Sequence, residues 1–153
     1  MKRFCAILLG LATLLPCAVH AQKVVLPPRD SQPSKPLLFS SLPDQFEVDR
    51  SELLKLFSAS VNDSIHLQLS PALQIEGRIV DKTQHNPGSL SVNVRVSNYS
   101  NALLNISMRL NADNSSNIQG RILHPKYGDI LQLYKEQDRY FIKKNSRGLY
   151  MPE

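Results

Sequence analysis

The sequence has almost none of the residues on which metal, thiol or cofactor chemistry depends. Its two cysteines, Cys5 and Cys17, both lie within the first 21 residues, and there is no tryptophan. Without those 21 residues the chain has no thiol and no disulfide framework, so burial of apolar side chains must hold it together. His-Glu-x-x-His, Gly-x-Ser-x-Gly and glycine-rich phosphate-loop motifs are absent. We therefore expect a protein that is not an enzyme, with no catalytic residues, no metal site and no cofactor.

The charge is also unremarkable in amount and in distribution. Removing Lys2 and Arg3 with the leader lowers the formal net charge from +5 to +3. Such a mild excess lacks the basic clustering of a nucleic-acid-binding protein, so we expect no nucleic-acid partner. It is compatible with an anionic partner of another class. The three histidines beyond the leader, His66, His85 and His124, are scattered without a ligand spacing and read as ordinary surface residues.

Residues 1–21 have the three parts of a secretory signal peptide. Lys2 and Arg3 form the positive start, an apolar run follows, and Val19 and Ala21 are the small residues that precede a cleavage site. The run is too short to span a membrane, and no second long apolar run follows it. We expect export to the periplasm or the medium, and the cysteine-free mature chain favours a bacterial source. Lipoprotein anchoring at Cys17 is a minor alternative, which Pro16 disfavours.

The remaining 132 residues divide into a spacer and one domain. Residues 22–43 contain five of the ten prolines, with serines between them, and we expect a flexible, extended tether. The apolar triplet Leu37, Leu38 and Phe39 is the exception and could dock on the domain. Residues 44–153 are expected to form a single domain, because that length can enclose one core.

Residues 49–61 are predicted to form a helix. Asp49 is a suitable N-cap, Glu52 has the capping-box spacing, and Val48 precedes the cap as one half of a hydrophobic staple. The helix should end near Asn62, where turn-forming residues begin. Its apolar stripe is expected to comprise Leu53, Leu54, Phe57 and Val61.

Beyond residue 64 the apolar period changes from 3.6 to 2, which indicates strands. The expected strands cover residues 65–69, 73–79, 90–96, 104–110, 118–123, 130–134 and 139–143. Short links between them imply antiparallel pairing. The predicted fold is mostly β (α+β): one N-terminal helix followed by a six- to seven-stranded antiparallel meander, curved into a half-barrel or a small barrel.

A short repeat marks two of these strands. Residues 75–80 read Ile-Glu-Gly-Arg-Ile-Val, and residues 118–123 read Ile-Gln-Gly-Arg-Ile-Leu. Six residues are too few to establish a duplication. Both copies place a glycine, Gly77 or Gly120, on the apolar face of its strand, where glycine permits a bend or the close approach of another segment.

Four arginines form the candidate binding site. Each of Arg78, Arg95, Arg109 and Arg121 occupies the polar phase near the middle of one of four consecutive strands. In a meander they share a face, and the allowed registers would set them as a band. Arginine suits carboxylates and phosphates, so the expected ligand is an anionic glycan, a lipid headgroup or an acidic protein surface. The alternative is a solvated face, on which Glu76, Asp81, Glu136 and Asp138 pair with the arginines.

Two functions follow from these patterns. The first is an exported, non-enzymatic binding module of the cell envelope or secreted fraction, which engages an anionic ligand through the arginine-bearing face. The alternative is a regulatory or inhibitory partner of another exported protein, similar in role to a propeptide or an inhibitor and acting by edge-strand pairing. The predicted edge is the strand at residues 139–143, since Lys143 and Lys144 are typical of edge protection. A hydrolase with an unfamiliar site ranks last.

Overall fold

The structure is a computed structural model that describes residues 35–113 and 115–146. The expected signal peptide and residues 22–34 of the expected tether lie outside the described residues, as do residues 147–153.

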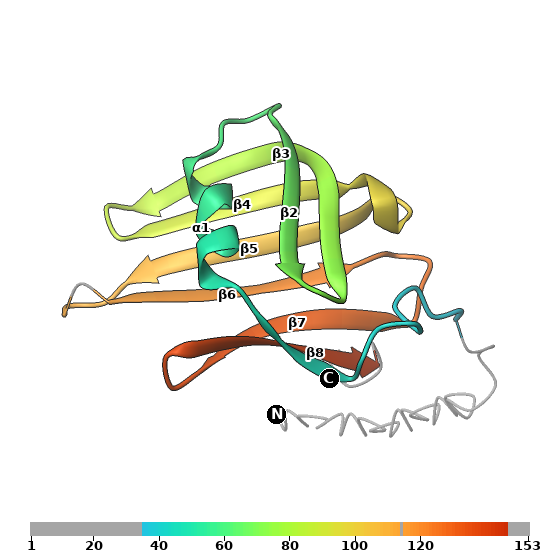
Figure 1. Cartoon of the computed structure of the whole chain (residues 1–153). Helices are drawn as coiled ribbons and strands as arrows, with labels where there is room; N and C mark the ends of the chain where they lie inside the picture. The colour runs from blue at the N-terminus through green and yellow to red at the C-terminus, as the bar shows by residue number, and fades with distance from the viewer. Residues whose placement is uncertain (1–34, 114, 147–153) are drawn as a thin grey trace, which may run out of the picture. The chain divides into compact units, whose positions relative to one another are not determined.

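The described chain forms one eight-stranded antiparallel sheet, which curls into a half-barrel, and one α-helix (Figure 1). This confirms the predicted fold class. The strand order is β1-β8-β7-β6-β5-β4-β3-β2, so that seven strands form a meander and β1 joins at its end. The elements are β1 (Gln45–Val48), α1 (Arg50–Ser58), β2 (Ser64–Ser70), β3 (Leu73–Asn86), β4 (Ser89–Val96), the 3-10 turn η2 (Ser97–Tyr99), β5 (Ala102–Leu110), β6 (Ser116–Leu123), β7 (Asp129–Glu136) and β8 (Arg139–Ser146).

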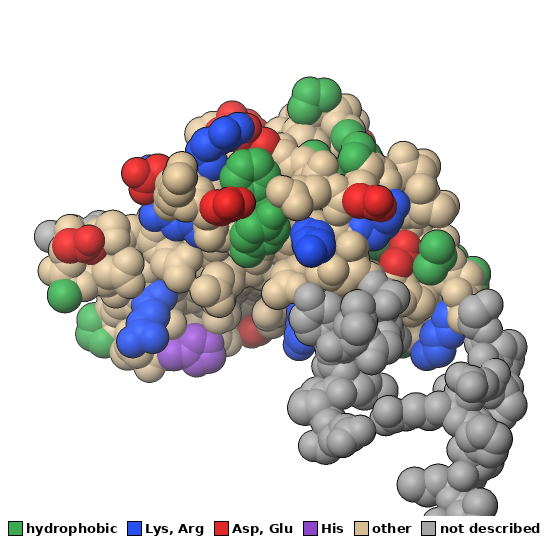
Figure 2. Space-filling model, turned by 90° about the horizontal axis from the view of Figure 1, so that it is seen from below, with side chains coloured by type: hydrophobic (Ala, Val, Ile, Leu, Met, Phe, Trp, Pro, Cys, Tyr) green, Lys and Arg blue, Asp and Glu red, His purple; other side chains and the backbone are tan. Residues whose placement is uncertain are grey.

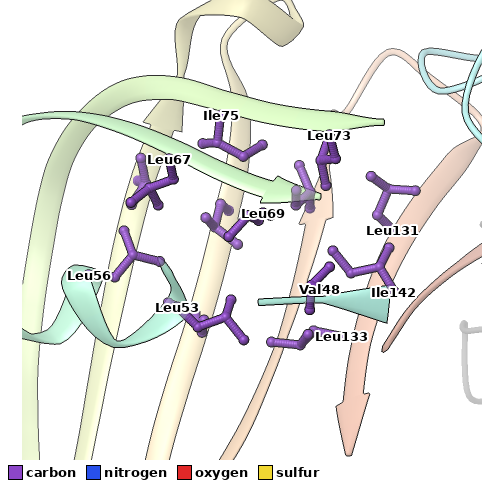
Figure 3. Packing of buried hydrophobic residues seen from close by; sticks show 14 of the residues in the cluster. Val48, Leu53, Leu56, Leu67, Leu69, Leu73, Ile75, Leu131, Leu133 and Ile142 are labelled. Atoms are coloured by element: carbon purple, nitrogen blue, oxygen red, sulfur yellow. The ribbon is translucent and has the colours of Figure 1, made fainter. Parts of the chain in front are cut away.

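The core lies on the concave face, because the strands alternate buried apolar residues with exposed polar ones. In β4, for example, Val92, Val94 and Val96 are fully buried. Side chains from both ends of the sheet meet α1 in this core (Figure 3). Within the described residues no helix is long and apolar enough to cross a membrane.

The N-cap follows the prediction, but the capping box and the end of the helix do not. The main-chain nitrogen of Asp49 donates to the oxygen of Leu69 instead of to Glu52, whose Oε2 accepts from the nitrogen of Gln68. Asp49 is the N-cap, and its carboxylate accepts a 2.7 Å hydrogen bond from the main-chain nitrogen of Ser51. The helix ends at Ser58 instead of near Asn62. The ammonium group of Lys82 in β3 donates to the carbonyl oxygens of Phe57 and Ala59, both at 2.8 Å. The last carbonyl groups of a helix have no hydrogen-bond donor within the helix. Lys82 supplies that donor here, so the helix can end at Ser58 without a further turn.

The buried stripe of the helix also differs from the expected one. Leu53, Leu56 and Phe57 are buried, whereas Leu54 is 37% exposed and Val61, beyond the helix, is 44% exposed. Leu56 follows Leu53 by three residues and so lies on the same side of the helix (Figure 3). The predicted stripe was therefore right at Leu53 and Phe57 and wrong at Leu54 and Val61, because it assumed a helix one turn longer, in which Val61 would continue the line.

Both repeat glycines lie where neighbouring strands come close. A Cβ atom on Gly77 would overlap the carbonyl oxygen of Arg95, and one on Gly120 would lie 2.7 Å from the carbonyl oxygen of Asn105. Close approach, one of the two reasons expected for glycine at these positions, is therefore observed. The long strand β3 bends over the core within its length (Figure 1).

The segment at residues 35–43 lies against the strand β7. The carboxylate of Asp129 accepts hydrogen bonds from the main-chain nitrogens of Leu38, at 2.8 Å, and Phe39, at 2.7 Å. Phe39 is fully buried, and its ring centroid lies 5.4 Å from that of Tyr99. Of the segment expected as a tether, this described end contributes Phe39 and Leu42 to the core.

The sheet nearly closes on itself. Its end strands β1 and β2 approach each other, and one backbone hydrogen bond in the described chain joins the two ends, from the nitrogen of Asp49 to the oxygen of Leu69 at 2.9 Å. The predicted edge at residues 139–143 was wrong, because β8 is paired on both sides, by β7 and by β1. The strand β1 was missed because four residues are too few to establish a period.

Candidate functional site

The convex face of the sheet carries a row of polar residues that crosses seven strands. These residues are paired from strand to strand. Asn93, Asn105 and Gln132 each lie between two buried residues, so the row faces away from the core, and Asp81 joins it beyond a bulge in β3. The row comprises Asp81, Asn93, Asn105, Arg121, Gln132, Lys143 and Gln45. Three of its members are joined directly: Asn105 Nδ2 donates to Asn93 Oδ1 at 2.7 Å, and Asn93 Nδ2 donates to Asp81 Oδ2 at 3.1 Å. The row thus presents one carboxylate, four amides and two cations along one line.

Arg78 and Arg95 lie beside this row and directly opposite each other in the register of β3 and β4. They line a hollow of about 390 Å³ with Ser64, Gly77, Val80, Ser97 and Asn101. Arg95 Nη1 donates to the carbonyl oxygen of Asn101 at 3.3 Å, and Arg95 is an exposed residue. Directly opposed like charges destabilise a sheet. The pair therefore forms a cationic hollow that an anion would stabilise.

Arg121 lies in a second hollow of about 370 Å³ on the same face. Its other polar lining residues are Asn105, Ser107, Gln119, Gln132 and Tyr134. Amides and hydroxyls both donate and accept hydrogen bonds, the guanidinium group donates in a fixed plane, and the tyrosine ring offers an amphipathic surface. This set of groups can hold a polar ligand that carries hydroxyl groups and a negative charge.

Arg109 lies apart from the other three arginines. It is opposite Ser89 on one side and Asn117 on the other, four residues along β6 from Arg121. The register fixed by the β5–β6 connection therefore divides the set: Arg78 and Arg95 form a pair, Arg121 occupies its own hollow, and Arg109 belongs to neither. Strand and residue spacings place the Cα atoms of Arg95 and Arg121 about 12 Å apart.

None of the four arginines forms an ion pair within the described residues. Of the acidic residues considered as partners, Glu76 lies 3.4 Å from His66, and the carboxylate of Asp81 accepts bonds from Asn93 and Thr83. Asp138 lies 3.3 Å from the ammonium group of Lys135. The arginines of the two hollows are therefore not neutralised by neighbouring carboxylates.

The histidines and carboxylates of the described residues do not gather into one site. They contain no cluster of three or more His, Asp or Glu side chains able to hold a metal ion. His85 contacts Ser91, and the ring of His124 packs against that of Tyr127 with centroids 5.0 Å apart. On the face drawn in Figure 2, basic and acidic side chains are interspersed and do not form a single-sign stripe.

Sequence reasoning identified the arginines but missed the residues that share their hollows. Asn105, Gln132 and Tyr134 occupy polar-phase positions, as many other residues do, and only the register shows that they surround Arg121. Their alternation was visible in the sequence, and their adjacency was not.

Comparisons with protein-family models, with curated protein sequences and with solved structures find no match to this chain.

Proposed function

We propose that this protein is an exported, non-enzymatic binding module of the cell envelope or secreted fraction, and that its convex sheet face binds an acidic polysaccharide. One observation carries the proposal. Arg78 and Arg95 lie directly opposite each other in an open hollow, with no acidic partner among the described residues. Opposite residues of an antiparallel pair have Cα atoms about 5 Å apart, so a carboxylate or sulfate can contact both guanidinium groups.

A polysaccharide fits the face better than the other anionic ligands. The amides and hydroxyls around Arg121 suit sugar hydroxyls, and the two hollows lie about 12 Å apart, so one extended chain can reach both. A lipid surface would favour apolar side chains beside the cations for insertion. Of the exposed large hydrophobic residues in the described chain, only Val80 lines either hollow.

The test compares three arginine variants with the wild type. Charge-assisted hydrogen bonds contribute about 1.5–3 kcal/mol each, so Arg95→Gln and Arg121→Gln should each weaken binding to polygalacturonate by about tenfold or more. Arg109→Gln is the matched control, because Arg109 is an exposed strand arginine on the same face outside both hollows. It should change the affinity less than threefold.

Binding should weaken as salt is added. The dependence of the affinity on salt concentration should be shallower in the Arg95 and Arg121 variants, and unchanged in the Arg109 variant. Dextran sulfate and vesicles of anionic phospholipid complete the panel. Failure of the wild type to bind either polysaccharide would contradict the proposal, and binding to the vesicles alone would assign the face to lipid headgroups. Equal losses in all three variants would show a nonspecific charge effect and would also contradict it.

A further inference from the structure

A groove follows the seam where the curled sheet fails to close. It has a volume of about 590 Å³ and lies between the last residues of β1 and those of β2, with the start of β8 beside it. Its lining includes Glu47, Val48 and Tyr140, together with residues 68–71 of the opposite wall. The side chains of Val48, Leu69 and Tyr140 are buried beneath it, and Figure 3 shows Val48 on β1 and Leu69 on β2 within the same core.

The main-chain groups of β1 that face away from β8 can be assigned from two hydrogen bonds. The nitrogen of Lys144 donates to the oxygen of Asp44 at 2.7 Å, so the main chain of Asp44 faces β8. In an antiparallel ladder this orientation alternates, so Phe46 and Val48 also face β8, whereas Gln45, Glu47 and Asp49 face away. The bond from the nitrogen of Asp49 to the oxygen of Leu69 agrees with that assignment.

On the opposite wall of the groove, main-chain groups at the end of β2 already have hydrogen-bond partners. The oxygen of Leu69 accepts from Asp49, and the nitrogen of Gln68 donates to Glu52 Oε2 at 3.4 Å. The start of α1 therefore protects the end of β2, and the edge of β1 at Gln45 and Glu47 remains available for strand pairing. A strand edge with outward N–H and C=O groups is a template for another extended chain.

We propose that the edge of β1 binds an extended peptide segment of another exported protein by β-augmentation. The guest would add a strand to β1, pairing with the main chain of Gln45 and Glu47. A strand of four residues spans about 13 Å, which limits the paired stretch to about four guest residues. Alternate guest side chains would point toward the apolar floor formed by Val48, Leu69 and Tyr140, so apolar residues at every second position are expected.

The recessed position of the edge distinguishes this guest from a second copy of the chain. The residues Gln68 to Pro71 form a wall facing the end of β1. A second folded copy would carry its own β1 behind the same wall, so the two edges could not meet. A single extended segment is narrow enough to enter. This inference is independent of the polysaccharide proposal, because none of the residues in the two arginine hollows lines the groove.

The test separates main-chain pairing from side-chain contacts at one position. Glu47→Pro removes a nitrogen–hydrogen group that faces the groove and takes no part in the β1–β8 ladder, so the fold should persist. Glu47→Ala is the matched control, since both variants lose the ion pair between Glu47 and Arg139 and only the proline loses the donor. Thermal unfolding of the full mature chain should give similar midpoints for the two variants.

The probe is a displayed library of random seven-residue peptides, selected on the wild-type protein and measured again as synthetic peptides. Peptides with alternating apolar residues should be enriched, should bind Glu47→Ala about as well as wild type, and should bind Glu47→Pro at least tenfold more weakly. Bound peptide should slow amide hydrogen exchange at Gln45 and Glu47. Arg95→Gln should have no effect.

Several results would overturn the inference. One is the absence of any peptide enriched on wild type over Glu47→Pro, and another is equal affinity of the enriched peptides for both Glu47 variants. Slow exchange at Gln45 and Glu47 in the free monomer would mean that the edge is already occupied. A concentration-dependent dimer that Glu47→Pro dissociates would assign the edge to a second copy of the chain.

Discussion

The buried carboxylate of Asp129 accepts a 2.7 Å hydrogen bond from the main-chain nitrogen of Phe39, which lies ninety residues earlier in the chain. The same carboxylate accepts from the nitrogen of Leu38, and Asp129 is only 3% exposed. One side chain at the start of β7 therefore fixes the segment that carries Phe39 into the core.

Replacing Asp129 with alanine should lower the free energy of unfolding by about 2–4 kcal/mol, because two main-chain nitrogens lose a charged acceptor in a buried site. Asp129→Asn, which keeps one acceptor oxygen, should cost less. Urea unfolding measures both changes. Asp138→Ala is the control, since that exposed residue should change stability by less than about 0.5 kcal/mol. Equal effects at the two positions would contradict this role of Asp129.

Alanine at Gly77 or Gly120 should also destabilise the sheet, because the new Cβ atom would meet the carbonyl oxygen of a neighbouring strand. Overpacking of this kind costs about 1–3 kcal/mol. Gly88→Ala serves as the comparison, since a Cβ there would lie no closer than 3.7 Å to its nearest neighbour. The measurement is the denaturation midpoint of each of the three variants. A Gly77 variant as stable as the Gly88 variant would contradict the close approach.

The hydroxyl of Tyr140 connects β8 to β6 across a gap in the ladder. It accepts from the nitrogen of Ile118 and donates to the oxygen of Ser116, both at 3.2 Å. The pairing of β6 with β7 covers Gly120 to Leu123 and does not reach these residues. Tyr140→Phe should therefore leave two buried main-chain groups unpaired, at a cost of about 1–3 kcal/mol, and should speed amide exchange at Ile118. Tyr134→Phe, on the other face, should do neither.

The cap at Asp49 predicts a pH dependence of stability. Hydrogen bonds from Ser51 lower the pKa of Asp49 below its usual value of 3.8. A carboxyl whose pKa is lower in the folded state contributes stability above its unfolded pKa, and this is lost as the pH falls through the folded pKa. The stability difference between wild type and Asp49→Ala should thus be largest at neutral pH and shrink below about pH 4. Asp49→Ser keeps a cap that carries no charge, so its stability relative to Asp49→Ala should be the same at both pH values. Urea titrations at pH 7 and pH 3 provide the comparison.

The phases of most strands could be read from the sequence because alternation is a local property. Residues 90–96 show it without interruption, and the structure places Val92, Val94 and Val96 in the core, as expected. The N-cap at Asp49 was equally local, since cap and partner are two residues apart. The end of the helix was not, because the ammonium group that caps it belongs to Lys82, in another strand.

The same distinction between local and non-local features applies to the candidate site. The sequence by itself determined that Arg78, Arg95, Arg109 and Arg121 face away from the core, because a period of two assigns each residue to one side of its strand. The tertiary structure alone decided which of them meet, since the register depends on the lengths of the connections and on packing across the whole sheet. The tertiary structure also decided that β1 pairs with β8, so that the edge of the sheet lies at Gln45 and Glu47 and not at residues 139–143. The groove beside Glu47 exists only because the curled sheet stops short of closing.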